Sequence, residues 1–492
     1  MRPATARWRS CSAIPTAGAR ICSACRRSTG WPRRWSRRFS RLSVGVSITV
    51  GFVVDDVQTD DGSSDGSGTA RVSRWDVVVV GGGFAGVAAA TRLGQAGVDV
   101  LLIDANDYHQ FQPLLYQVAT SQIGISEVAR PLRSMFRRQE TVRVAISAVT
   151  GIDAGGRTVT LDDGTVCAGR ALVIATGAQA NFFGIDGAAE YSYPLYSLDD
   201  AVRLAGGMLS ALDEADRLSA PRDPIDLVVV GGGATGVEFA GAAAESLASA
   251  VAAVFPGDLA ARTTVHLVDM VPTVLGPFSE KSQKYARSVL ERAGVRLHLG
   301  KGVTAVRGDG VTLEDGTRVP ARMVVWAGGL KGRDVLAGAG LPLGRGGRVD
   351  VAADLTVDGL DGVYALGDSA NITDAKGRAL PQLGSVAQQS GKWAARNILA
   401  DFSGRHREPF AYRDKGIMAM IGRGAAVAEV GPRRWKFRGP AAFVAWLGVH
   451  AALLSGVWQR VGAVASWSVG YFTKYRPQAM VAHVAQDLRR GN

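Results

Sequence analysis

The sequence DVVVVGGGFAG, residues 76–86, decides the fold of this 492-residue chain. Its first five residues are typical of a short buried strand, and an apolar helical stretch follows over residues 87–95. Between the two, Gly81 permits a tight turn, Gly83 lets the backbone approach a pyrophosphate, and Gly86 lets the helix pack closely on the strand. We therefore expect the start of this helix to face a bound anion.

A carboxylate follows the second strand, at the position where a strand–turn–helix unit of this kind needs one. The next strand, residues 98–103, ends in Asp104, 23 residues after Gly81. A carboxylate at this position can accept hydrogen bonds from both hydroxyls of an adenosine ribose. A glycine-rich turn alone is a weak signal, but the strand, turn, helix and terminal acid together predict a dinucleotide-binding Rossmann unit.

The whole pattern recurs 150 residues later. Residues 227–230 form the expected strand, residues 237–253 the expected helix, and residues 264–268 a second strand that ends in Asp269. No Arg or Lys adjoins Asp269, and a carboxylate there would repel the 2′-phosphate of NADPH, so NADH is the favoured dinucleotide. A surface Asp that contacts no ribose is the alternative. The glycines of this second turn are Gly231, Gly233 and Gly236.

Later segments repeat as well, at nearly the same offset. TLDDGT at 160–165 returns as TLEDGT at 312–317, and LVIATG at 172–177 returns as MVVWAG at 323–328. Two copies of one topology are difficult to obtain by chance. The sequence therefore predicts an α/β fold with two Rossmann-like dinucleotide-binding domains. The residues that close these last two strands are Thr176, Gly177 and Gly328.

The net charge of +12 is carried by the two ends of the chain. Residues 1–54 contain eleven Arg and no Lys, Asp or Glu, and residues 431–492 hold nine Lys and Arg against one Asp. The part between them is mildly acidic and has no basic stripe with interleaved aromatic residues, which argues against nucleic-acid binding.

Cysteine usage excludes one kind of chemistry. Cys167 is the only cysteine after residue 25, so the body of the chain has neither a disulfide framework nor the cysteine pair that disulfide-reducing flavoenzymes need. We also expect no metal site.

The first 70 residues stand apart from the rest. An Arg-rich start is followed by an apolar run over residues 42–54 and then by an acidic, polar stretch. This order mimics a signal peptide, but 13 apolar residues are too few to span a bilayer, and no small-residue cleavage motif follows. We expect a disordered or mis-started leader over residues 1–70, with a targeting or membrane-contacting segment as the alternative.

Four further motifs support a family assignment: DANDYHQFQPLLYQVA at 104–119, GVE at 236–238, YRDKG at 412–416 and IGR at 421–423. Together with the two glycine turns, they resemble the type II NADH dehydrogenases, which are single-subunit NADH:quinone oxidoreductases of the two-dinucleotide-binding flavoprotein superfamily. The resemblance covers residue 74 to the end. It implies that the first turn holds FAD and the second holds NADH. It also implies that Gly367 and Asp368 belong to the flavin motif, with Asp368 meeting a ribityl hydroxyl.

Several of these residues also have plain structural explanations. Asp368 follows an apolar strand, at the edge where open α/β sheets bind ligands, but it could be a simple turn residue. The resemblance places Glu238 beside the nicotinamide as a proton relay, yet a first-turn Glu is also favourable at any helix N-terminus. Core packing alone could explain the apolar residues within 108–118.

The predicted quinone site lies in PQLGSVAQQSG at 381–391. This segment aligns with a family segment that opens a helix beside the flavin and supplies an Ala-Gln pair to the quinone. Here the pair reads Gly384-Ser385, with Gln388 and Gln389 about one turn later. Ser385 keeps a hydrogen-bonding group but is shorter, so the quinone contact is rebuilt or altered. Gln388 and Gln389 could also be ordinary polar helix residues.

The C-terminal segment suits a membrane surface. RRWKFR at 433–438 precedes residues 439–459, which contain no Asp, Glu, Lys or Arg. Large side chains from Phe443 to Trp458 fall on one helical stripe, and a second aromatic-rich helix follows Arg460. We expect these helices to dock in one leaflet with anionic headgroups, with a spanning helix or a buried dimer interface as alternatives.

The predicted enzyme passes a hydride from NADH to FAD and then two electrons to menaquinone or ubiquinone without pumping protons. We expect it to be monotopic on the cytoplasmic face of the cell membrane, and a homodimer. A soluble NAD(P)H-dependent reductase of a small redox protein such as ferredoxin, which would tolerate loss of residues 433–492, and a sensor that binds FAD and NADH without turnover are the alternatives. After the leader, the predicted parts are the FAD domain (71–221 and 343–405), the NADH domain (222–342) and a membrane-associating region (406–492).

Overall fold

The computed structural model describes residues 72–217, 225–252, 255, 259–431 and 433–473. The leader predicted over residues 1–70 lies outside them, as does the end of the C-terminal region.

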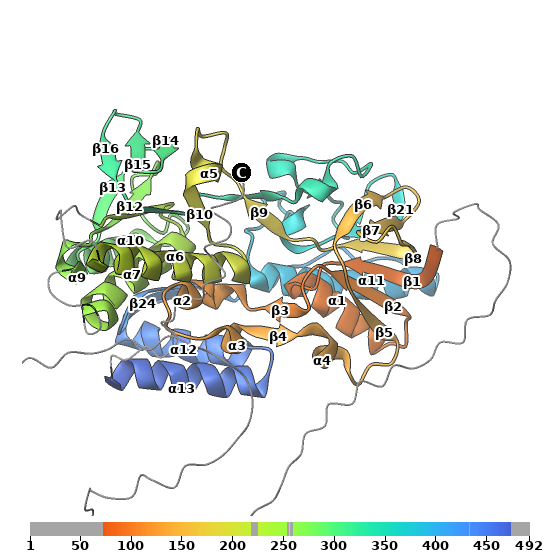
Figure 1. The fold of residues 1–492 in the computed structure, drawn as a ribbon. Helices are drawn as coiled ribbons and strands as arrows, with labels where there is room; N and C mark the ends of the chain where they lie inside the picture. Colours follow the sequence, from red (N-terminus) through yellow and green to blue (C-terminus); the bar gives the residue numbers. More distant parts are fainter. Residues whose placement is uncertain (1–71, 218–224, 253–254, 256–258, 432, 474–492) are drawn as a thin grey trace, which may run out of the picture. The chain divides into compact units, whose positions relative to one another are not determined.

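An eight-stranded sheet is built around the first glycine turn (Figure 1). Its central strand β1 pairs in parallel with β2 on one side and with β8 on the other. Val77, Val78 and Val79 are fully buried, as expected for a strand covered on both faces. The strand order is β20 (Thr356–Val357), β21 (Leu360–Ala365), β8 (Val166–Ile174), β1 (Val72–Val80), β2 (Val100–Asp104) and β5 (Val142–Ile146), with β6 (Val149–Asp153) and β7 (Thr158–Leu161) attached through β8.

Helix α1 (Phe84–Gly94) leaves the glycine turn and packs against α11 (Gly384–Phe402). The helix begins three residues earlier than the sequence suggested, because Gly83 caps it and the Val87 N–H already donates to the Gly83 carbonyl at 3.0 Å. Only the three glycines at 81–83 therefore separate β1 from α1.

A second sheet of five parallel strands surrounds the second turn. Its helix α7 (Ala234–Ser246) again begins three residues early and continues as a π-helical turn over Leu247–Val251. α6 (Leu198–Arg217) and α10 (Glu280–Arg292) also pack in this half. The strand order is β10 (Ser192–Pro194), β17 (Met323–Trp326), β11 (Leu227–Val230), β12 (Val265–Asp269) and β13 (Arg296–Leu299).

The repeat seen in the sequence is also a repeat of geometry. β7 and β15 (Gly310–Leu313) each end in an Asp-Gly turn with the same hydrogen bonds. The Leu161 N–H donates to Thr165 and the Leu313 N–H to Thr317, both at 2.9 Å. β15 lies between β14 (Val303–Arg307) and β16 (Arg318–Pro320). The prediction of an α/β fold with two Rossmann-like halves is confirmed.

The C-terminal region forms a small antiparallel sheet followed by two helices. The sheet pairs β23 (Gly416–Gly422), β24 (Ala425–Val430) and β25 (Trp435–Gly439). The helices are α12 (Pro440–Leu453) and α13 (Val457–Thr473), which lie along the lower edge of Figure 1. Trp446 on α12 is fully buried in the same core as β11 and α7, so this region is part of the folded body.

The expectation that the large side chains from Phe443 to Trp458 share one helical stripe is wrong. Leu454 adopts extended backbone (ψ 137°) and ends α12, and α13 starts only at Val457. Two arginines stabilise the break: Arg130 donates to the Ser455 carbonyl, and Arg460 donates to the Leu454 carbonyl at 3.0 Å. Within the described ranges, no helix is long and apolar enough to cross a bilayer.

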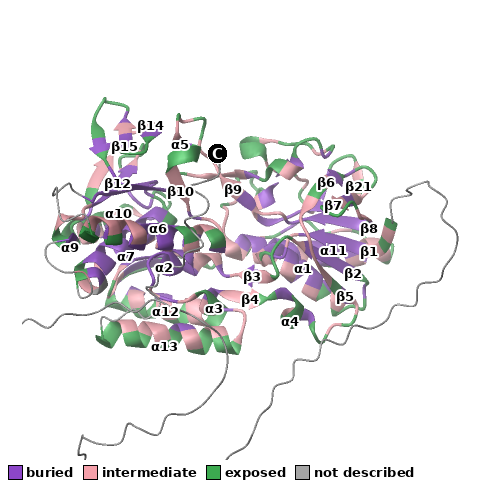
Figure 2. Cartoon of the chain, viewed as in Figure 1, coloured by how far each residue is buried: buried purple, intermediate pink, exposed green. Residues whose placement is uncertain are grey.

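The break also changes which side chains face outward. Trp446 and Leu454 of the expected large stripe are buried in the core, whereas Val457 and Trp458 from the same stripe are exposed. The large face of α12 therefore packs against the protein, and α13 supplies most of the exposed apolar surface (Figure 2).

Candidate functional site

Both glycine turns have the same backbone conformation. Gly81 has φ +109° and Gly231 has φ +114°, values that residues with a side chain rarely adopt. A Cβ atom on either residue would also overlap the carbonyl of the neighbouring strand end, Ala175 in the first half and Ala327 in the second. Only glycine fits at these two positions.

The other glycines of the two turns are of two kinds: some are packed against backbone, and others face open space. A Cβ on Gly86 would overlap the Gly81 carbonyl, and one on Gly236 would overlap the Gly231 carbonyl. Beside Gly83 and Gly233, in contrast, no atom of the described residues other than the adjoining backbone lies within 4 Å of where a Cβ would stand. Each turn thus leaves open space next to a helix N-terminus, which suits a pyrophosphate.

The two acids are fixed in the same way. Asp104 accepts hydrogen bonds from the Gly82 N–H at 2.6 Å and from the Asn106 N–H at 2.8 Å. Asp269 accepts from the Gly232 N–H and, at 2.8 Å, from the Val271 N–H. Both carboxylates are held at a strand end beside the glycine turn, where the sequence placed them for ribose binding. Within the described part of the chain, no Lys or Arg forms an ion pair with Asp269.

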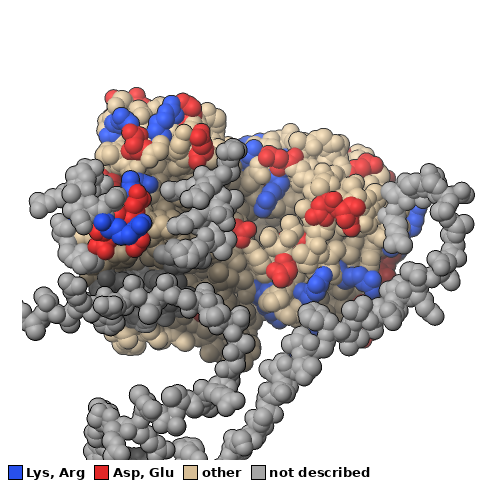
Figure 3. Space-filling model, viewed as in Figure 1, with Lys and Arg blue, Asp and Glu red and all other residues tan. Residues whose placement is uncertain are grey.

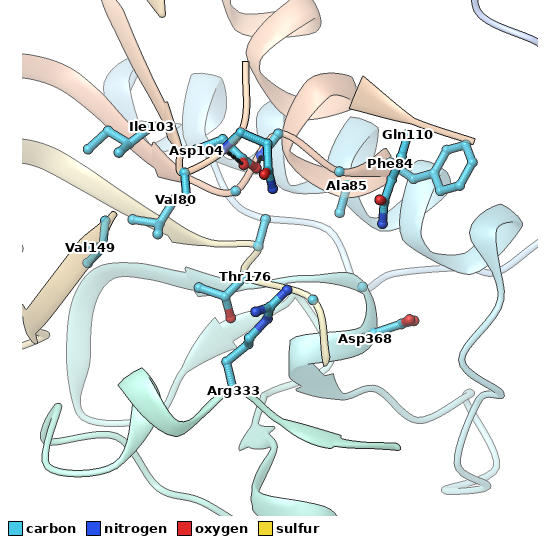
Figure 4. Close-up of a pocket in the computed structure, with 18 of the residues that line it drawn as sticks. Val80, Phe84, Ala85, Ile103, Asp104, Gln110, Val149, Thr176, Arg333 and Asp368 are labelled. Carbon is cyan, nitrogen blue, oxygen red and sulfur yellow. Dashed lines mark hydrogen bonds between the residues drawn. The ribbon is translucent and has the colours of Figure 1, made fainter. Parts of the chain in front are cut away.

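A cavity of about 410 Å³ opens at the first glycine turn. Figure 4 shows Asp104, Thr176, Arg333 and Asp368 around it, contributed by four segments far apart in the sequence. Among the residues that the structure describes, the buried Thr176 hydroxyl has no hydrogen-bond partner, so the cavity wall contains a polar atom that a ligand could satisfy. The predicted residues that line it are Gly81, Gly83, Asp104, Thr176, Gly177, Gly367, Asp368 and Gly384.

Asp368 is held by a residue that the sequence did not indicate. The Tyr196 hydroxyl donates to Asp368 at 3.0 Å and accepts from the Ala178 N–H at 3.1 Å. Burial raises the pKa of Asp368 above its usual value, while Tyr196 and nearby Arg348 oppose that shift. The carboxylate is thus positioned at the cavity wall as a hydrogen-bond acceptor for a hydroxyl.

The residues of the predicted quinone site have different neighbours. Gly384 begins α11 and lies against the ring of Phe84, which also lines the cavity. The Ser385 hydroxyl is 2.9 Å from the hydroxyl of Tyr412. Gln389 exchanges two hydrogen bonds with the backbone of Arg413, at 3.0 and 3.1 Å. Gln389 thus holds a loop, which is the ordinary structural role that the sequence left open.

Glu238, on α7, is half-buried and lies outside the lining of this cavity. Its carboxylate accepts from the Met420 N–H at 3.1 Å. Burial raises the pKa of Glu238 to about 8, and the Met420 N–H and the Trp446 side chain oppose that shift. Among the described residues, the buried indole N–H of Trp446 forms no hydrogen bond, so its effect on Glu238 is that of a nearby dipole.

A series of ring contacts joins the cavity to Glu238. Phe84 contacts Phe111 with centroids 5.7 Å apart, and Phe111 contacts His450 at 6.3 Å. His450 stacks on Trp446 at 3.8 Å. Burial lowers the pKa of His450 to about 4, so this ring is neutral at neutral pH. These ring contacts therefore connect the first glycine turn to α12 and, through Trp446, to Glu238.

Known proteins share this arrangement. The family model for pyridine nucleotide-disulphide oxidoreductases matches residues 75–391. The type II NADH:quinone oxidoreductase Ndh of Mycobacterium tuberculosis is 37% identical over 425 residues, which cover 83% of this chain and 90% of that protein. The chain belongs to the type II NADH:quinone oxidoreductases. NdhA of the same organism, also of this type, is 36% identical over 427 residues, covering 83% of this chain and 89% of NdhA.

The fold of this type II oxidoreductase is similar to that of a solved structure. NDH2 from Plasmodium falciparum, determined in complex with NADH, matches with a TM-score of 0.75 at 17% identity, covering 82% of this chain and 99% of that one. Although the family model is named for disulphide chemistry, Cys167 is buried and is the only cysteine among the described residues. The described part of the chain therefore has no cysteine pair for the disulphide chemistry after which the family model is named.

Several residues of the site carried no sequence signal. Tyr196 stands in no motif, and its contact with Asp368 spans 172 residues. His109 stands among apolar and aromatic residues in the sequence, yet it is buried and its Nδ1 lies 2.9 Å from the Gly82 carbonyl. Trp446 and His450 were assigned to a membrane-facing stripe, because helical periodicity identifies a face without saying what covers it.

The choice of dinucleotide can be tested at Asp269. In Asp269→Asn, the amide oxygen can still accept from Gly232, but the charge that would repel a 2′-phosphate is gone. We expect the ratio of kcat/KM for NADPH to that for NADH to rise at least about tenfold, which corresponds to about 1.4 kcal/mol. Glu280→Gln, at an exposed acid paired with Lys284 on α10, is the matched control and should leave the ratio unchanged. An unchanged ratio in Asp269→Asn would mean that Asp269 does not distinguish the ribose of NADH from the phosphorylated ribose of NADPH.

Proposed function

We propose that this chain is a flavoenzyme that oxidises NADH and reduces a quinone without pumping protons. The observation that carries the proposal is the duplication of one glycine-turn geometry, including its strand-end acid, in a chain 37% identical to a type II NADH:quinone oxidoreductase. The cofactors supply the chemistry, hydride transfer from NADH to the flavin ring followed by two-electron reduction of the quinone. The protein's own task is to bind, orient and manage protons.

The first half would hold FAD. The open space beside Gly83 suits the pyrophosphate, Asp104 suits the adenosine ribose, and the unpartnered Thr176 hydroxyl can bond a polar flavin atom. Asp368, fixed by Tyr196, would accept from a ribityl hydroxyl. Gly81 and Gly86 shape the turn, and Gly177 and Gly367 bring the backbone close to the cofactor, as lining residues of the cavity.

The second half would hold NADH by the same means. Gly231 and Gly236 shape the turn, Gly233 leaves room for the pyrophosphate, and Asp269 accepts from the ribose hydroxyls. Gly328 follows β17 at the position that Gly177 occupies after β8.

Protons for the quinone would come from Glu238. With a pKa of about 8, its carboxyl is mostly protonated at neutral pH and can donate. The quinone would approach beside Gly384 and Ser385 at the start of α11, where Phe84 begins the series of ring contacts that connects the cavity to Glu238. Of the two glutamines predicted for the quinone site, Gln388 is the one that could contact the quinone, because Gln389 is bonded to the backbone of Arg413.

The C-terminal helices would dock on the membrane surface. Trp458 is 83% exposed and Phe472 is 82% exposed, both on α13, and exposed valines lie between them. Lys436 and Arg438 on β25 and Arg460 on α13 are exposed and suit anionic headgroups. On the face shown in Figure 3, Lys and Arg are interspersed with Asp and Glu and form no continuous basic surface. Docking would lie on the cytoplasmic face, where NADH is available, and the homodimer stays a prediction.

Two substitutions test the docking surface. The double variant Trp458→Glu/Phe472→Glu places charges on exposed side chains without disturbing the core. We expect its partition coefficient on vesicles with anionic lipids to fall at least about tenfold, while reduction of a water-soluble quinone analogue is unchanged. Val72→Glu, at an exposed valine of β1, is the control for added charge and should bind vesicles normally. Equal binding by all three proteins would refute this surface.

Removing residues 433–492 is not a useful test of a soluble enzyme. Trp446, Leu454 and Ala463 belong to the buried core, and β25 pairs with β24, so truncation would unfold part of the body. Activity with a panel of acceptors separates the alternatives instead. The purified chain should contain FAD and consume NADH in equimolar amounts with added quinone, whereas faster turnover with a ferredoxin, or none with any acceptor, would contradict the proposed function.

A further inference from the structure

Two consecutive phenylalanines after β9 (Ala178–Ala180) have opposite surroundings (Figure 1). Phe182 is half-buried and packs on Trp326, with ring centroids 5.5 Å apart. Phe183 is 61% exposed, and its backbone has φ +52°, in the left-handed region that a residue with a large side chain rarely adopts. The fold therefore holds one aromatic ring out in solvent in an unfavourable backbone conformation.

Three hydrogen bonds fix this conformation. The side-chain oxygen of Asn181 accepts from the Phe183 N–H at 2.9 Å. The Asn181 N–H donates to the Gly329 carbonyl at 3.0 Å, and the Asn181 carbonyl accepts from the indole N–H of Trp326 at 2.8 Å. The Phe183 ring lies against Gly329, since a Cβ on that glycine would be 2.9 Å from the ring atom Cζ. The loop is thus tied to the end of β17, and the exposure of Phe183 is specified by the fold.

The end of β17 is where the nicotinamide ring of NADH would lie. In the second sheet, β11 lies between β12 and β17. The glycine turn after β11 would hold the pyrophosphate, and Asp269 at the end of β12 would hold the adenosine ribose. A dinucleotide that runs across these strand ends must therefore continue from the glycine turn toward β17, away from Asp269. Gly328 and Gly329 follow β17 there, with the Phe183 ring against Gly329.

Exposed apolar side chains stand at both ends of this path. Met270 and Val271 come directly after Asp269, on the adenosine side, and both are exposed. Phe183 is the exposed apolar residue on the other side, at β17. Adenine and nicotinamide rings both have flat faces that pack favourably on apolar and aromatic side chains. The two ends of the path thus match the two rings of one dinucleotide.

We propose that the Phe183 ring contacts the nicotinamide ring of NADH and is a positioning residue for hydride transfer. This inference rests on the proposed function, because it takes the second half of the chain to bind NADH. An exposed Phe alone is ordinary, since much of any protein surface is apolar. Here the backbone conformation is also unfavourable and is maintained by three hydrogen bonds, as for strained residues at binding sites. The alternative is that Phe183 only covers Gly329, in which case its ring stabilises the fold and not the bound dinucleotide.

ADP-ribose is the probe that separates the nicotinamide ring from the rest of NADH, because it lacks only that ring. The test uses the full FAD-loaded chain. It measures the NADH concentration that gives half the maximal rate of flavin reduction, and the inhibition constant of ADP-ribose in the same reaction. In Phe183→Asn we expect the NADH concentration to rise about tenfold, because a ring contact is lost, and the ADP-ribose constant to stay unchanged. Phe183→Tyr keeps the ring and should behave like the parent.

Stability distinguishes a binding role from a structural one. Asn adopts left-handed backbone more readily than Phe does, so Phe183→Asn should keep its FAD and unfold at the parent's temperature or above it. Tyr191→Asn is the matched control. Tyr191 is an exposed aromatic residue at the end of α5 (Ala188–Tyr191), directly before β10 and therefore at the opposite edge of the sheet. This variant should respond to NADH and ADP-ribose like the parent.

Three outcomes would overturn the proposal. One is an unchanged NADH requirement in Phe183→Asn. Another is an equal loss of affinity for NADH and for ADP-ribose, which would place the effect on the adenosine or the pyrophosphate. The third is loss of FAD or a lower unfolding midpoint in Phe183→Asn, which would show that the ring stabilises the fold. A parent chain whose flavin is not reduced by NADH would instead contradict the proposed function, so the two failures are distinguishable.

Discussion

Gly83→Ala should fold like the parent chain and contain almost no FAD. Apart from the adjoining backbone, no atom of the described residues lies within 4 Å of the added Cβ, and the backbone of Gly83 needs no left-handed conformation, so the substitution does not strain the fold. The methyl group would instead occupy the space proposed for the FAD pyrophosphate. We expect the ratio of FAD to protein after purification to fall at least about tenfold.

The matching substitution in the second half should have a different effect. Gly233 has the same open surroundings as Gly83, so Gly233→Ala should also fold, and it should keep its FAD. Flavin reduction by NADH should then need at least about tenfold more NADH to reach half its maximal rate. Gly276→Ala, at an exposed and open glycine outside both turns, is the control and should behave like the parent. If both turn variants lost the same cofactor, the assignment of one cofactor to each half would be wrong.

Glu238→Gln should separate the two half-reactions. The amide can still accept from the Met420 N–H but cannot donate a proton to the quinone as an acid. We expect flavin reduction by NADH to change little and quinone reduction to slow by about a hundredfold, as for loss of a general acid. In the parent, quinone reduction should decline as the pH rises past about 8, because the carboxyl ionises there. This decline should be absent in the variant.

Stability provides an independent check on this carboxyl. Its pKa is raised by burial from an ordinary value near 4.5 to about 8, so the folded chain holds a proton that the unfolded chain releases. The parent should therefore lose stability relative to Glu238→Gln as the pH rises from about 4.5 to about 8. Glu214→Gln, at an exposed acid paired with Arg322, should follow the parent. A parallel pH dependence in parent and Glu238→Gln would show that Glu238 has an ordinary pKa.

The sequence predicted the parts of the fold that depend on local pattern and repetition. The valine strand before Gly81 and the acid Asp104 could be recognised from short stretches of sequence, and so could their second copies. Each of these stretches specifies the backbone around it. Helix starts were placed three residues late in both halves because Gly83 and Gly233 cap the helices and Gly86 and Gly236 already belong to them.

The contacts that complete the site could not be predicted in this way. Tyr196 meets Asp368, and Trp446 approaches Glu238, only because distant segments pack together. Helix α12 shows the same limit. Its large side chains follow a helical stripe, but a stripe covered by β24 and β23 has the same periodicity as one covered by lipid. The helix ends at Leu454, where two arginines bind the backbone carbonyls. In the sequence, only Gly456 indicates a break at this place.

The central claim is that electrons pass from NADH through a bound flavin to a quinone, and sequential stopped-flow mixing without oxygen tests it most directly. The first mixing step adds NADH to the purified chain, and the second adds a soluble menaquinone or ubiquinone analogue. We predict that NADH bleaches the visible absorbance of the flavin and that at least one quinone restores it as fast as steady-state turnover requires. A flavin that NADH does not bleach, or that no quinone reoxidises at that rate, would contradict the claim.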